Sequence, residues 1–164
     1  MSTQRIDDFR GEYRWLSNFQ ESRVHYAGVG FPTVEHAYVA AKQHDCEHFR
    51  NVLLCKTPRD VKNYGSTVKL RDDWEYVKLL IMNDLVREKF HVHGELREKL
   101  ILTGGAYLEE GNTWGDRYWG VCDGVGDNNL GRILMKVREE ITFRRWLQAR
   151  PDWISGKPDW WRWQ

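Results

Sequence analysis

Hydrophobic positions recur with a helical period through much of the chain. Across residues 72–90, apolar side chains fall at roughly helical spacing, which predicts one amphipathic helix. A further helix is expected around residues 96–101, and the glycine pair 104–105 ends it. The pattern also predicts a last amphipathic helix over residues 130–141. Most of the chain before Leu102 is likewise expected to be helical.

Short strands and turns are expected outside these helices. Residues 5–9 and 24–26 have strand-like character and flank a polar turn at residues 15–19. Thr33 follows a glycine-rich turn and is placed to cap a helix that we expect over residues 34–44.

Proline and glycine mark the remaining elements. Pro58 fits the first turn of a helix near residues 59–64. Residues 107–109 and 119–121 are candidate strands, and a loop rich in glycine and asparagine at 123–129 precedes the last helix. Together these elements predict a mainly α (α+β) fold with a few short strands.

The composition is that of one globular domain with a single core. Of the 164 residues, 41% are apolar and 30% are charged. Lys and Arg number 25 against 24 Asp and Glu, so the net charge of +1 creates no general attraction for nucleic acid. Nucleic acid would therefore have to bind through a local patch. We expect one compact domain over residues 1–142 and a tryptophan-rich extension over residues 143–164.

The extension holds four of the nine tryptophans, Trp153, Trp160, Trp161 and Trp163. They could stack on unpaired bases, or lie in a membrane interface or a partner groove. Packing back onto the domain is the simpler expectation. Pro151 and Pro158 interrupt any long amphipathic helix, so no membrane-bound helix is expected here.

The cysteines and histidines fit no metal or disulfide pattern. Three cysteines without CxxC spacing are typical of reduced thiols in a cytosolic protein. Neither an HExxH motif nor paired CxxC motifs are present, so we expect no metal and no cofactor. The absence of a signal-length or bilayer-spanning apolar run predicts a soluble cytoplasmic protein without membrane contact.

The stretch from Thr33 to Lys42 is the first candidate for chemistry. On a helix, Glu35, Tyr38 and Lys42 share one face, so an acid and an amine can point into one cleft. The alternative is a surface acid and a surface amine on a solvated helix, which composition alone favours. The small alanines between them favour a helix packed closely on both sides.

Two further stretches could contact a ligand. Asp116 lies between Trp114 and Trp119, an arrangement suited to a sugar hydroxyl beside a stacked base. Equally, the carboxylate could cap a turn while the two indoles fill the core. Residues 124–131 are glycine-rich before a helix and could cradle a phosphate, although a plain turn is the better expectation.

In order along the chain, these stretches resemble motifs of the NADAR (YbiA-like) family. The resemblance runs from about Ile6 to Ile141. The matching motifs are Leu16-Ser-Asn-Phe19, Thr33-Val-Glu-His36, Ala41-Lys42, Asp73-Trp74-Glu75 with Lys78 and Met82, Lys89-Phe90, Leu96-Arg97, Leu100, Asp116 with Tyr118-Trp119-Gly120, and Asn128-Asn-Leu-Gly131.

The resemblance implies a mainly helical fold and N-glycosidase activity. Some members are similar to enzymes acting on ribosylamino pyrimidine phosphates early in riboflavin synthesis. Others resemble ADP-ribosyl hydrolases that remove ADP-ribose from guanine bases. We expect the second activity, with an ADP-ribose-type nucleotide on DNA or RNA as the partner. A non-catalytic ADP-ribose-binding module is the alternative from another class, and the oligomeric state stays open.

The family motifs assign site residues to this chain. By resemblance, the catalytic set is Glu35, Lys42 and Asp116. Residues implied in substrate binding are Asn18, Phe19, His36, Tyr38, Trp74, Trp119, Gly120, Asn128 and Gly131. The family helix often reads EHYFQAQK, whereas Ala37 and Val39 stand here in place of larger residues. This departure could reshape the pocket, so it leaves the substrate open.

Overall fold

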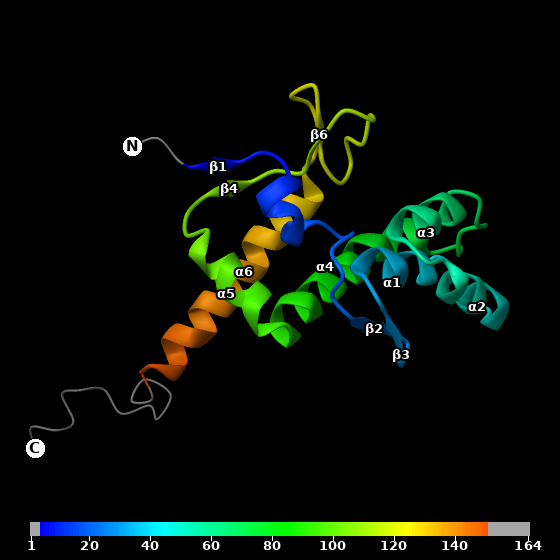
Figure 1. The fold of residues 1–164 in the computed structure, drawn as a ribbon, viewed down its shortest axis with the longest axis horizontal. Coiled ribbons are helices and arrows are strands. Elements are labelled where there is room, and N and C mark those ends of the chain that lie inside the picture. Colours follow the sequence, from blue (N-terminus) through cyan, green and yellow to red (C-terminus); the bar gives the residue numbers. More distant parts are fainter. Residues whose placement is uncertain (1–3, 151–164) are drawn as a thin grey trace, which may run out of the picture.

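The chain folds around one long central helix. The computed structural model describes residues 4–150, and that range contains six short strands and seven helices, one of them a 3-10 helix (η1) (Figure 1). In chain order they are β1 (Arg5–Ile6), η1 (Gly11–Leu16), β2 (Val24–Tyr26), β3 (Val29–Phe31), α1 (Val34–Ala40), α2 (Cys46–Leu54), α3 (Pro58–Gly65), α4 (Trp74–Val92), α5 (Gly94–Leu102), β4 (Tyr107–Leu108), β5 (Gly111–Asn112), β6 (Val121–Cys122) and α6 (Asn129–Gln148). The four tryptophans of the predicted extension lie outside the described residues.

Helix α4 passes through the middle of the domain and contacts α1, α5, α6 and β2 (Figure 1). Its buried apolar side chains include Met82, Leu85, Val86 and Phe90. Their spacing puts them on one face, where each contributes roughly 1.5–3 kcal/mol by leaving water. The helix predicted over residues 72–90 is thus confirmed.

Across residues 4–150, no helix has both the length and the apolar character needed to cross a membrane.

Helix α1 is packed on almost every side. Thr33 caps its first turn by accepting a hydrogen bond from the amide of His36, as the sequence predicts. The alanines at 37 and 40 are fully buried and allow α3 and α4 to approach closely. Among residues 34–40, Glu35 alone is not classed as buried.

Helix α1 is shorter than the predicted 34–44. It ends at Ala40, and the carbonyl of Lys42 then accepts a hydrogen bond from the amide of Arg71. That bond ties the end of α1 to the segment that leads into α4. Tertiary pairing of the main chain therefore stops the helix where local propensity would continue it.

The strands form three two-stranded pairs in the described part of the chain. Strands β1 and β4 are parallel, as are β5 and β6, whereas β2 and β3 form an antiparallel hairpin. Ala27 and Gly28 both have positive φ, which suits the two-residue turn of that hairpin. The parallel pairs join segments that are distant in sequence, so local pattern alone does not locate them.

Several boundaries differ from the prediction. The strand expected at 5–9 ends at Ile6, because the chain turns at Gly11, whose φ is +53°, into η1. Part of the expected turn at 15–19 belongs to that helix, and the strand expected at 119–121 lies at Val121–Cys122. Helix α6 continues past residue 141 to Gln148.

Strand β4 and helix α6 cross at very short range. A Cβ atom placed on Gly131 would lie 2.2 Å from the carbonyl oxygen of Leu108 and 2.5 Å from the side-chain oxygen of Asn128. Only hydrogen fits there without displacing backbone. Gly131 is therefore required by packing between these two elements.

Replacing Gly131 by alanine should destabilise the fold. We expect Gly131→Ala to lower the free energy of unfolding by about 1–3 kcal/mol, because backbone must move to admit the methyl group. Urea denaturation followed by circular dichroism measures the loss. Gly105→Ala is the matched control, since its Cβ would meet nothing within 4 Å. Equal stability of the two variants would contradict the packing role.

Candidate active site

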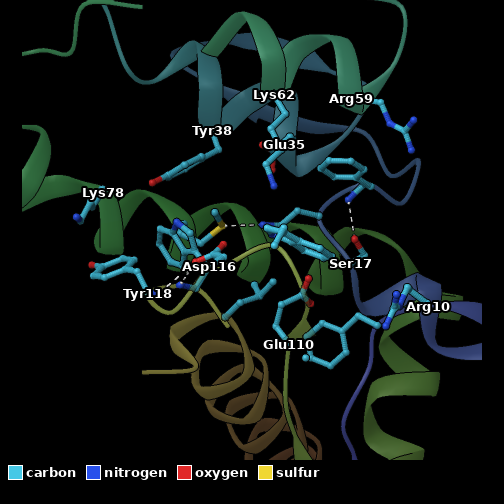
Figure 2. A pocket seen from close by; sticks show the side chains of 18 of the residues that line it. Arg10, Ser17, Glu35, Tyr38, Arg59, Lys62, Lys78, Glu110, Asp116 and Tyr118 are labelled. Atoms are coloured by element: carbon cyan, nitrogen blue, oxygen red, sulfur yellow. Dashed lines mark hydrogen bonds between the residues drawn. The ribbon is translucent and has the colours of Figure 1, made fainter. Parts of the chain in front are cut away.

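One cavity of about 730 Å³ opens beside the N-terminal half of α4 (Figure 2). Its wall is built by the segment around η1, by α1, α3 and α4, and by the loop between β4 and β6. The volume is typical of a small-molecule site. Leu130 of α6 also lines it, so six separate parts of the chain meet around one ligand-sized space.

Glu35 and Lys42 both line this cavity. They lie on the same face of α1 and just beyond its end, as their spacing of seven predicts. The amide of Glu35 donates a 3.1 Å hydrogen bond to the carbonyl of Asn18, which fixes the first turn of α1 against the N-terminal segment. The alternative, in which both residues are solvated on the surface of the helix, is therefore wrong.

Burial controls the ionisation of Glu35. Loss of water raises the pKa of its carboxyl group to about 7, while the positive charges of Lys62 and then Lys42 oppose the rise and Asp116 adds to it. A carboxyl group with a pKa near neutrality can act as either base or acid at physiological pH.

The amine of Lys42 is anchored rather than free. Its Nζ donates a 2.7 Å hydrogen bond to the carbonyl of Gly65, at the end of α3. Burial lowers the pKa of Lys42, Glu35 raises it, and Lys62 lowers it further. The stabilising effect of the nearby carboxylate is thus smaller than the effect of burial.

Asp116 both caps a turn and faces the cavity. Its Oδ1 accepts hydrogen bonds from the amides of Tyr118 and Trp119, at 3.2 and 2.9 Å. The side chain nevertheless lines the cavity. The two indoles do not fill the core: Trp114 is 55% exposed and Trp119 is half-buried at the cavity wall.

Aromatic rings form one side of the cavity. Tyr38 contacts Trp74 and Trp119 with ring centroids 5.1 and 5.5 Å apart, and Tyr118 meets Trp119 at 4.9 Å. All four rings line the cavity. Such a surface can stack on a planar base.

The N-terminal segment contributes Asn18 and Phe19. The side-chain oxygen of Asn18 is buried and has no hydrogen-bond partner among residues 4–150, so it can accept a bond from a ligand hydroxyl. The main chain beside it is held by Lys89, whose Nζ donates 2.8 Å to the carbonyl of Ser17. Burial lowers the pKa of Lys89 to about 7, and Glu110 opposes that shift.

Four expected substrate-binding residues do not line the cavity: His36, Gly120, Asn128 and Gly131. The ring of His36 is buried and contacts the Thr33 hydroxyl and the Cys55 carbonyl. A Cβ on Gly120 would lie 2.1 Å from the carbonyl of Glu110. The structure therefore gives these residues contacts with neighbouring elements rather than with the cavity.

Several charged residues of the cavity were not predicted. They are Asp8, Arg10, Arg14, Arg59, Lys62, Lys78 and Glu110. In a sequence, charged residues of this kind are usually solvent-exposed surface residues, so no local pattern marks these as part of a site. Lys62 lies over the rings of Phe19 and Trp114, at 5.8 and 5.4 Å, and so joins two parts of the wall.

Within residues 4–150 no group of three or more His, Cys, Asp or Glu is arranged for a metal ion.

The fold and cavity define a small helical domain with an acid, an amine and an aromatic wall around one ligand site. The chain belongs to the NADAR family, because the NADAR domain profile matches residues 7–142. It is 38% identical over 135 residues to an N-glycosidase of Nostoc punctiforme, covering 79% of this chain and 86% of that protein. It is 34% identical over 137 residues to N-glycosidase YbiA of Escherichia coli, covering 82% and 85%.

The structural comparison agrees with the sequence relationship. The NMR structure of Escherichia coli YbiA matches with a TM-score of 0.79 at 32% identity, over 88% of this chain and 89% of that one. A riboflavin biosynthesis protein of Vibrio vulnificus is 35% identical over 130 residues, which is 77% of this chain but 35% of that protein. The predicted family and fold class are therefore confirmed, and the cavity is the candidate active site of an N-glycosidase-type hydrolase.

The burial of Glu35 should cost stability at high pH. Because its pKa is raised, the folded chain holds this proton more tightly than the unfolded chain, so stability falls as pH rises from 4.5 to about 7. Glu35→Gln mimics the protonated form. We expect it to match the wild type at pH 4 and to exceed it at pH 8 by on the order of 1–3 kcal/mol.

Chemical denaturation at the two pH values measures this difference. Glu47→Gln is the control, because Glu47 is exposed on α2 and does not line the cavity. A pH-independent difference between Glu35→Gln and the wild type would show that Glu35 is solvated like an ordinary surface acid.

Proposed function

We propose that this protein hydrolyses the ribosyl–nitrogen bond that links ADP-ribose to a guanine base of nucleic acid. The observation that carries the proposal is the shared cavity of Glu35 and Lys42, bounded by aromatic rings that contact one another in tilted and edge-to-face arrangements. The aromatic wall suits a base, and the carboxyl group suits the charge that develops on ribose.

The chemistry follows from the charge that develops in this reaction. Breaking an N-glycosidic bond builds positive charge on the anomeric carbon and negative charge on the leaving nitrogen. A carboxylate beside that carbon stabilises the cation or activates a water molecule. Glu35 is the residue that we assign to this role.

Lys42 has two possible roles in the proposal. As a cation it stabilises Glu35 or donates a proton; as a neutral amine it attacks ribose and opens the ring through a Schiff base. The second role requires a lowered pKa, and burial acts in that direction. The bond from its Nζ to Gly65 holds the amine in place for either role.

Cations along the cavity support a phosphorylated ligand. Arg14, Arg59 and Lys62 line it together with Arg10, although Arg10 also pairs with Asp8 at 2.8 Å. Guanidinium groups bind phosphate through paired hydrogen bonds. Because the net charge is only +1, this local cluster is where a diphosphate or nucleic-acid backbone would be held.

A second candidate is a ribosylamino pyrimidine phosphate. The Vibrio vulnificus relative is named a riboflavin biosynthesis protein. Hydrolysis of such a substrate in this cavity would use the same acid and one phosphate site. A non-catalytic ADP-ribose-binding module would use the same cavity. Retention of an acid and an amine on one helix face favours catalysis over binding alone.

Replacing the acid should abolish turnover. Glu35→Gln is expected to lower the rate of base release by about 10²–10⁴-fold without unfolding the protein. An oligonucleotide carrying ADP-ribosylated guanine serves as substrate, with free ADP-ribose as the readout. A variant with near wild-type turnover would remove Glu35 from the mechanism. A wild type that binds the oligonucleotide without releasing ADP-ribose would favour the binding module.

Lys42→Arg separates the two roles of the lysine. Arginine keeps the positive charge but forms no Schiff base. If the covalent route operates, Lys42→Arg should lose activity. Borohydride should then trap an adduct on the wild type but none on Lys42→Arg. Substantial residual turnover would exclude that route. Assaying a ribosylamino pyrimidine phosphate in parallel decides between the two substrate classes.

A further inference from the structure

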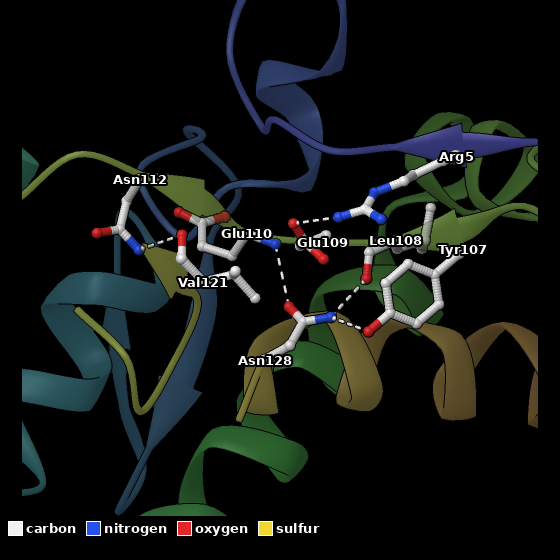
Figure 3. A network of polar contacts seen from close by, with 8 residues as sticks. All are labelled: Arg5, Tyr107, Leu108, Glu109, Glu110, Asn112, Val121 and Asn128. Atoms are coloured by element: carbon white, nitrogen blue, oxygen red, sulfur yellow. Dashed lines mark hydrogen bonds and ion pairs between the residues drawn. The ribbon is translucent and has the colours of Figure 1, made fainter. Parts of the chain in front are cut away.

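Glu110 enters the cavity on a rigid segment of extended chain between β4 and β5. Its amide donates a 3.1 Å hydrogen bond to the side-chain oxygen of Asn128, and its carbonyl accepts one of 2.9 Å from the amide of Val121 (Figure 3). The amide group of Asn128 donates in turn to the carbonyl of Leu108 and the hydroxyl of Tyr107. The main chain at Glu110 is thus held on both sides.

The neighbouring acid points the other way. Successive residues of an extended chain face opposite sides, and Glu109 pairs with Arg5 at 2.6 Å, outside the cavity. Glu110 lines the cavity together with Glu35 and Asp116. Figure 2 shows Glu35 on α1 and Glu110 on opposite walls.

The carboxyl group of Glu110 is incompletely satisfied. Its Oε2 is buried and has no hydrogen-bond partner in the described part of the chain. A buried polar atom without a partner is costly to a fold and is retained where a ligand completes it. The residue that carries this atom lines the cavity.

We infer that Glu110 is the second carboxyl group of the reaction and donates the proton that the leaving base nitrogen takes up. This inference rests on the N-glycosidase function proposed above. Water adds its oxygen to the anomeric carbon and passes one proton to the Glu35 carboxylate. The carbon–nitrogen bond breaks, its electron pair stays on nitrogen, and Glu110 supplies the proton there. Return of the proton from Glu35 to Glu110 through solvent closes the cycle.

The surrounding charges favour ionisation of Glu35 more than ionisation of Glu110. Two lysines, Lys62 and Lys42, favour the ionised form of Glu35. Around Glu110, burial and then the negative charge of Asp116 raise its pKa to about 7, with Lys62 as the main opposing charge. The charged groups that act on Glu110 or respond to it are Asp8, Arg10, Glu35, Lys62, Lys89 and Asp116. Two coupled carboxyl groups that share one proton are the usual basis of acid–base catalysis.

The first test follows the carboxyl group itself. The side-chain ¹³C resonance of Glu110, assigned through bonds in the wild-type protein, should titrate near pH 7 instead of near the ordinary 4.5. This measurement needs neither a substrate nor a folded variant. A titration near 4.5 would overturn the inference while leaving the proposed function intact.

The second test reads the pH profile of turnover. The wild type should show an acid limb from Glu35 and a basic limb from Glu110. Glu110→Gln should lower the rate by about 10²–10⁴-fold and remove the basic limb, whereas Glu109→Gln should leave both unchanged. Glu109 is the matched control, because it is the adjacent residue and faces away from the cavity.

The outcomes separate the two claims. A Glu110→Gln variant that keeps the basic limb or the wild-type rate overturns the inference. In another outcome, the wild type turns over only the ribosylamino pyrimidine phosphate, and Glu110→Gln loses the basic limb for that substrate. This outcome overturns the proposed guanine substrate and supports the role of Glu110 as proton donor. A wild type that cleaves neither substrate overturns both.

Discussion

The burial of helix α1 is the constraint on which the site depends. Every residue from Val34 to Ala40 is buried except Glu35, which is half-buried at the cavity, so the helix cannot rotate without exposing apolar surface. Small residues let α3 and α4 pack against it, which brings Lys62 and Trp74 to the same cavity as Glu35. Packing of one short helix thus fixes the position of the central acid.

That packing has an electrostatic consequence. Removing water from Glu35 and Glu110 raises the pKa of both carboxyl groups to about 7, and lysines around the cavity limit the rise. A buried acid is unfavourable for folding unless it is neutral or paired. The domain tolerates this because its apolar core, which α1, α4 and α6 share, stabilises the fold.

The two halves of the cavity are held by different means. On one side, α1, α3 and α4 position side chains through helix packing. On the other, two-residue strands and the side chain of Asn128 hold the loop that carries Glu110 and Asp116. Asn128 has a left-handed backbone with φ of 52°, a conformation that asparagine tolerates better than most residues. The motif that contains Asn128 and Gly131 therefore supports the wall from behind.

The sequence alone determined the mainly helical fold, the capped start of α1, and the face shared by Glu35 and Lys42. These features follow from periodicity and from a spacing of seven residues, which are local properties of a helix. Family motifs also led to Asp116 and to the aromatic residues of the wall. They did not separate residues that line the cavity from residues that support it, such as His36 and Gly131.

Only the tertiary structure decided where the chain ends α1, which charges surround the acid, and which way each acid of the Glu109–Glu110 pair faces. The bond between Lys42 and Arg71, the parallel pairing of β5 with β6, and the approach of Lys62 all join residues far apart in sequence. No local pattern encodes such contacts, because they arise when separate elements exclude water from a common space. Burial, and with it the ionisation of the carboxyl groups, is a property of that assembled space.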